Sequence, residues 1–172
     1  MNPRVIIWLD PGQTTGVARW ISPEVKASHP ALPEFACHQV SDCDEDLGLA
    51  TLFGELTKAS SLAVPYVGSG IVVLGYERFE FRRDERYRDK IDYTAPEVIG
   101  AIRAWRLSRT YVTLDSLGAA GAKAFWTDEK IKQLGLWVPG LRHGMDALRH
   151  LLYKLAFKYH REDLLRLLKP GS

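Results

Sequence analysis

The 172-residue chain is 46% hydrophobic and 26% charged, and its formal net charge at pH 7 is +2. This composition predicts one well-buried globular domain over 1–172 and excludes two domains of ordinary size. The small net charge does not indicate a class of binding partner, so only local clusters of charged residues can. Two cysteines cannot build a zinc site alone, and the lack of a leader or a membrane-length apolar run predicts a soluble, cytoplasmic protein with no membrane partner.

A strand and a tight turn open the chain. The apolar run Val5–Leu9 is typical of a strand buried on both faces, and Pro11 and Gly12 predict a turn into a second strand over 15–21. Asp10 then ends a buried strand, where a carboxylate is costly to desolvate unless a positive charge meets it. A metal ion would supply that charge, although Asp-Pro-Gly is also ordinary turn chemistry.

The later elements predict an α/β fold with a five-stranded mixed sheet, in which three antiparallel strands precede parallel ones and helices flank both faces. The segment between the second and third strands, 22–33, is expected to be an exposed loop. The remaining expected strands span 35–40, 70–77 and 111–114. The expected helices span 44–61, a segment from 94 onward, 117–134 with a break near Trp126, and 142–160 with a further turn through Leu168.

Further acids accompany Asp10. Glu77 ends the second buried apolar strand, so we expect it beside Asp10, with Glu80 in the following loop as the alternative. On the last helix, His143, Asp146 and His150 fall within about 60° of one another. We expect them on a face away from the core, with these side chains on the core face: Met145, Leu148, Leu152, Leu155 and Tyr159. Converging carboxylates are typical of magnesium sites.

The combination of these motifs resembles the RuvC-type Holliday junction resolvases of the ribonuclease H-like superfamily. The resemblance spans the whole chain and rests on the first hairpin with Asp10, on Glu77 after the fourth strand, and on His143-x-x-Asp146 in the last helix. The segments 124–130 and 143–150 are similar to short versions carried by actinobacterial phages and prophages, which would place the protein in a host cytoplasm.

The resemblance implies which residues carry the chemistry. Asp10, Glu77 and Asp146 would bind two Mg²⁺ or Mn²⁺ ions, and His143 stands where many relatives have another acid. His143 could therefore be a metal ligand or a proton carrier. The expected reaction is two-metal phosphodiester hydrolysis.

Two regions are expected to contact DNA. Lys123 is similar to a DNA-contacting lysine of the family. The loop 79–92 interleaves cations with aromatic residues, a combination that grips partly opened DNA: Arg82, Arg83, Arg86, Phe79 and Phe81. Acids in the same loop offset most of its charge, so a solvated, salt-bridged loop is the alternative.

The predicted function is a structure-selective endonuclease that cleaves branched DNA, with four-way junctions as the expected substrate. Paired cuts on two strands favour a two-fold homodimer, for which the candidate surfaces are the helix around Trp105 and the terminal leucines 164, 165, 167 and 168. Completing the core is the alternative role for these leucines, and the one favoured for any single leucine. Three alternatives stay open. They are a nuclease on flaps or forks, a degenerate DNA-binding module, and an ATP-binding domain, because 10–16 is also similar to the first phosphate loop of the actin, sugar-kinase and heat-shock ATPase superfamily.

Overall fold

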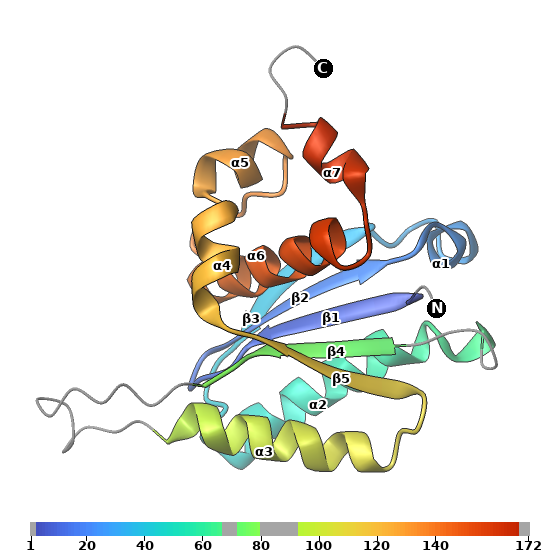
Figure 1. Cartoon of the computed structure of the whole chain (residues 1–172). Coiled ribbons are helices and arrows are strands. Elements are labelled where there is room, and N and C mark those ends of the chain that lie inside the picture. Colours follow the sequence, from blue (N-terminus) through green and yellow to red (C-terminus); the bar gives the residue numbers. More distant parts are fainter. Residues whose placement is uncertain (1–2, 67–71, 80–92, 169–172) are drawn as a thin grey trace, which may run out of the picture.

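A single five-stranded sheet in the order β3-β2-β1-β4-β5 forms the centre of the computed structural model, which describes residues 3–66, 72–79 and 93–168 (Figure 1). The strands are β1 (Val5–Asp10), β2 (Thr15–Ile21), β3 (Phe35–Val40), β4 (Val72–Glu77) and β5 (Val112–Leu117). The first three strands are antiparallel neighbours, whereas β4 pairs in parallel with both β1 and β5. The predicted mixed sheet is therefore confirmed.

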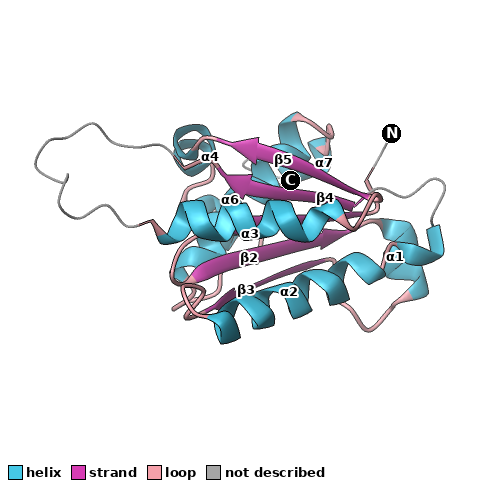
Figure 2. Ribbon diagram, turned by 90° about the horizontal axis from the view of Figure 1, so that it is seen from below, coloured by secondary structure: helices cyan, strands magenta, loops and turns pink. Residues whose placement is uncertain are grey.

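Helices cover both faces of this sheet. One face carries α2 (Asp46–Ser61) and α3 (Thr94–Leu107), which Figure 2 shows from below in front of the strands. The other face carries α4 (Ala119–Phe125), α5 (Asp128–Gln133), α6 (Arg142–Phe157) and α7 (Glu162–Arg166). Two short helical segments complete the described chain, α1 (Pro23–Ser28) and the 3-10 turn Val64–Tyr66. None of the described helices has the length and apolar character needed to cross a membrane.

The central strand β1 is buried on both sides. Alternate side chains of a strand point to opposite faces, so Val5, Ile7 and Leu9 pack in the cluster with α2 and α3, while Ile6 and Trp8 pack in the cluster with α6. All five side chains are fully buried. This burial explains the unbroken apolar run, and it leaves Asp10 as the first acid along the strand.

Two glycines allow α6 to approach the sheet closely. A Cβ at Gly16 would lie 1.9 Å from the carbonyl oxygen of His143, and a Cβ at Gly144 would lie 2.8 Å from the carbonyl oxygen of His38. Both neighbours are backbone atoms, which cannot swing aside as the end of a side chain can. The start of α6 therefore crosses β2 and β3 at backbone contact distance, and this brings His143 to the end of β1.

The segment 22–33 differs from its prediction as a loop because it contains α1. Ser22 caps this helix by accepting a hydrogen bond from the Val25 amide, and Pro23 occupies its first turn. Both residues suit a helix start, and the signal was present in the sequence.

The boundaries of later elements also differ. β5 continues to Leu117, which pairs with Glu77, so the helix expected from 117 begins only at Ala119. The predicted break near Trp126 is confirmed and separates α4 from α5. The expected helices over 44–61 and 142–160 are shorter than predicted, since α2 begins at Asp46 and α6 ends at Phe157.

The surfaces expected to support a dimer are largely part of the core. Trp105 is 9% exposed and Leu164 is 4% exposed, and both belong to buried clusters. Leu165 and Leu168 pack against the same core as Leu164. Only Leu167 of the predicted leucines is strongly exposed, at 55%. Trp105 offers little surface to a partner because α3 buries it against the sheet.

Candidate active site

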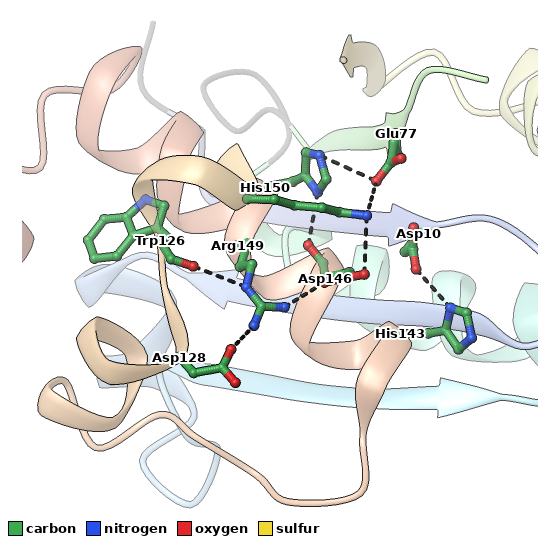
Figure 3. A network of polar contacts seen from close by, with 9 residues as sticks. Asp10, Glu77, Trp126, Asp128, His143, Asp146, Arg149 and His150 are labelled. Atoms are coloured by element: carbon green, nitrogen blue, oxygen red, sulfur yellow. Dashed lines mark hydrogen bonds and ion pairs between the residues drawn. The ribbon is translucent and has the colours of Figure 1, made fainter. Parts of the chain in front are cut away.

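Asp10 and Glu77 end two neighbouring parallel strands. Leu9 on β1 is in register with Tyr76 on β4, so the next residue of each strand reaches the same edge of the sheet. Asp10 is 9% exposed, and the side chain of Glu77 is 19% exposed. Figure 3 shows both carboxylates near the start of α6. Glu77 thus lies where the sequence predicted it, whereas the alternative, Glu80, lies outside the described residues.

Asp146 on α6 faces Glu77 across an ammonium group. The Nζ atom of Lys123, on α4, lies 3.0 Å from Glu77 Oε2 and 3.1 Å from Asp146 Oδ2. Partial burial acts to lower the pKa of Lys123, but hydrogen bonds to these two acids and their charges raise it overall. Lys123 therefore serves as a counter-ion inside the acid cluster here, and its contact with DNA stays a prediction.

Asp10 pairs with His143 at the start of α6. The Nδ1 atom of His143 lies 2.9 Å from Asp10 Oδ2. Burial raises the pKa of Asp10 to about 6, against the hydrogen bond from His143, and the charges of Glu77 and Asp146 also raise it. The nearby Lys123 acts in the opposite direction but does not restore the ordinary value. The ionised form of Asp10 is thus disfavoured mainly by burial and also by the two neighbouring acids, so a cation beside it would be favourable.

Arg149 holds Asp146 in place. Its guanidinium donates to Asp146 Oδ1 at 2.5 Å and to the carboxylate of Asp128, and its Nε donates to the carbonyl oxygen of Trp126 at 3.0 Å. Because the Arg149 side chain is only 12% exposed, these charge-assisted bonds form in a partly dehydrated setting and fix the carboxylate. Sequence reasoning missed Arg149. Its position three residues after Asp146 on one helix was the available signal.

His150 is buried, so the prediction that it shares an outward face with His143 is wrong. Its ring stacks on Trp8 with centroids 6.0 Å apart and 5° between the planes. The Nδ1 atom donates to the Asp146 carbonyl oxygen at 2.9 Å, and Nε2 lies 3.5 Å from Glu77 Oε2. Burial lowers the pKa of His150. The core face of α6 is wider than expected because α6 packs against the sheet and also against α4 and α7.

The donor set of Asp10, Glu77, His143 and Asp146 suits a hard divalent cation such as Mg²⁺ or Mn²⁺. Within the described residues, and in the positions the side chains have here, no three His, Cys, Asp or Glu side chains form a group that could hold a metal ion. The Lys123 ammonium stands between two of the four donors and already marks a point where carboxylates converge on a positive charge. The residues therefore fit a divalent ion by their donor chemistry, and Glu77 and Asp146 already meet at a single positive charge.

Most of the loop predicted to grip DNA lies outside the described residues. Arg82, Arg83, Arg86 and Phe81 lie within 80–92, outside the described residues, so their contact with DNA stays a prediction. Phe79 is described, and it is partly buried against the hydrophobic cluster beside β4. The packing of Phe79 holds the chain against the core directly after β4.

Comparison with solved structures identifies the fold. Two structures from T. thermophilus, "RuvC structure" and "RuvC in complex with Holliday junction substrate", each match with a TM-score of 0.56 and 14% sequence identity. Each match covers 91% of this chain and 96% of the other. No protein-family model and no curated protein sequence matches the chain. The chain therefore has a RuvC-like fold of the ribonuclease H-like type, as the sequence predicted.

Proposed function

We propose that this chain is a metal-dependent endonuclease that cleaves branched DNA, with four-way junctions as its principal substrate. The proposal rests on three carboxylates that β1, β4 and α6 bring to one end of the sheet, where burial raises the pKa of Asp10 and one ammonium, that of Lys123, pairs with Glu77 and Asp146. One solved structure with the same fold contains a Holliday junction substrate, which supports DNA of this kind as the substrate.

Asp10, Glu77, Asp146 and His143 would hold two Mg²⁺ or Mn²⁺ ions. Such ions activate water and stabilise the leaving oxygen in phosphodiester hydrolysis. Lys123 pairs with Glu77 and Asp146 in this structure, and with the ions bound its ammonium would be free to contact a DNA phosphate. The side chain of His143 is 41% exposed, so it can exchange protons with solvent while it orients Asp10 through their 2.9 Å contact.

Close packing accounts for the glycine at position 16 of the first hairpin. Gly16 is required because the backbone of His143 approaches within 1.9 Å of its Cβ position. A phosphate-binding role is not needed to explain this glycine, so the nuclease is favoured over an ATP-binding domain. We also propose that the protein works as a cytoplasmic homodimer, because resolving a junction requires paired cuts on two strands.

The test is a cleavage assay on end-labelled DNA. Wild-type protein with Mg²⁺ or Mn²⁺ is expected to cut a four-way junction faster than a fork, a flap or plain duplex. Asp10→Asn keeps the side-chain volume but removes the charge, so cleavage should fall by at least about 10²-fold while junction binding survives. Cleavage of plain duplex at the same rate as the junction would contradict branch selectivity. Undiminished cleavage by D10N would contradict the assignment of the site.

A further inference from the structure

A cavity of about 580 Å³ adjoins the candidate active site between α5 and the start of α6. Lys123 and Asp146 line one part of it, and Trp137, Val138 and Arg142 line another. Its volume lies within the range of roughly 300–1,000 Å³ that is usual for pockets holding small organic molecules. The cavity is therefore large enough for a group of nucleotide size directly beside Asp146.

Two lining residues supply the chemistry that a nucleotide needs. Trp137 is half-buried, packs against the core and has the Lys132 ammonium 4.9 Å from its ring centroid, so the indole is held in place. Arg142 is exposed, and its side chain makes no hydrogen bond or ion pair with any residue in the described ranges 3–66, 72–79 and 93–168. Arg149, in the same cavity, is already bound to two acids. Between these two arginines, Arg142 is thus the one whose guanidinium is available to bind a phosphate.

We infer that this cavity binds one unpaired nucleotide of the DNA strand that is cut at the candidate active site. The base would stack on Trp137, and a neighbouring phosphate would meet Arg142. A base in plain duplex must leave its stack to enter such a cavity, at a cost of a few kcal/mol, whereas a branch point offers bases that are already unpaired. This inference rests on the proposed function and deepens it, because the cavity supplies a physical reason for preferring branched DNA.

The first test pairs a protein substitution with a DNA substitution. Binding of four-way junctions is measured in the D10N background, with single abasic nucleotides placed in turn on both sides of the cleaved phosphate. At one position, loss of the base should weaken binding by about 5- to 150-fold when Trp137 is present. In the Trp137→Ala protein, loss of the same base should have no further effect. Trp137→Phe should retain the coupling, which separates stacking from a general loss of fold.

The second test uses Arg142, whose side chain is exposed, so that its removal should leave the fold intact. Arg142→Ala should lower the slope of log affinity against log salt by about one unit, and Arg142→Lys should restore it. Lys58→Ala is the matched control, since Lys58 is exposed on α2 at the other face of the sheet. It should leave the slope unchanged.

The outcomes distinguish the cavity from the function on which it depends. The nucleotide site alone would be overturned by two results together. In the first, D10N binds the junction but loss of Trp137 is coupled to no base. In the second, Arg142→Ala leaves the salt slope unchanged. Failure of D10N to bind any branched DNA, together with failure of the wild type to cut it, would overturn the proposed function and the cavity with it.

Discussion

The two ends of α6 contribute to two charge clusters with opposite balance. Near the end of the helix, Lys154 and Lys158 place their ammonium groups 3.0 Å and 2.9 Å from one carboxylate, that of Asp115. Burial acts to raise the pKa of Asp115, but hydrogen bonds from the two lysines lower it overall. Near the start of the helix, burial raises the pKa of Asp10 to about 6, and the neighbouring cations do not offset it.

This difference separates a structural ion pair from the candidate active site. Asp115 has two cations for one negative charge, so its ionised form stabilises the fold without help from outside. Around Asp10, Lys123 is divided between Glu77 and Asp146, and Arg149 is divided between Asp146 and Asp128. A cluster that is short of positive charge is costly to keep in a folded protein, and perturbed acids of this kind concentrate at functional sites.

Loss of Arg149 should have the largest effect on stability. Arg149→Ala leaves Asp146 and Asp128 without their partner, so the free energy of unfolding should fall by about 3 kcal/mol. The matched change in the other cluster, Lys154→Ala, should cost about 1 kcal/mol or less, because Lys158 still holds Asp115. Urea denaturation measures both values. Equal losses would contradict the difference in charge balance between the clusters.

The close approach of α6 at Gly16 should matter nearly as much. Gly16→Ala pushes the backbone at His143 away from β2, so stability should fall by about 1–3 kcal/mol and junction cleavage should slow by up to about 10²-fold. Gly100→Ala is the control on α3, where a Cβ meets no atom within 4 Å. That substitution should stabilise the protein by about 0.5–1 kcal/mol and leave cleavage unchanged. Normal cleavage by Gly16→Ala would show that the positioning of His143 does not depend on this contact.

The pH dependence of stability should have opposite signs in the two clusters. In metal-free protein, ionising Asp10 is harder in the folded state, so the free energy of unfolding should decrease by on the order of 1–2 kcal/mol as the pH rises from about 4 through about 6. The D10N protein should lack this decrease. Asp115 has a lowered pKa, so its contribution is present above its unfolded pKa and is lost as the pH falls further.

Unfolding titrations of wild type, D10N and Asp115→Asn in a chelator, across this pH range, measure these contributions. The difference between D10N and wild type should grow with pH. The difference between wild type and Asp115→Asn should instead vanish at low pH. The same sign for both variants would contradict the comparison.

The sequence predicted the sheet and its acids because these depend on local patterns. Apolar runs that end in Asp10 and Glu77 mark buried parallel strands, and the register of β1 and β4 then brings both acids to one edge. The burial of His150 was not predictable from helical periodicity, which gives the angle between residues but not the width of the face that neighbouring helices cover. The bond between Arg149 and Asp128 joins residues 21 positions apart across a turn, and no local pattern encodes it.

Direct measurement of metal binding tests the central claim most sharply, namely that the cluster of Asp10, Glu77 and Asp146 holds divalent cations whereas the Asp115 cluster does not. Free Mn²⁺ can be titrated by its electron paramagnetic resonance signal in the presence of wild type, D10N and Asp115→Asn at neutral pH, without DNA. We expect wild type and Asp115→Asn to bind Mn²⁺ equally and D10N to lose most of the binding. Equal binding by D10N and wild type, or none by the wild type, would contradict the account.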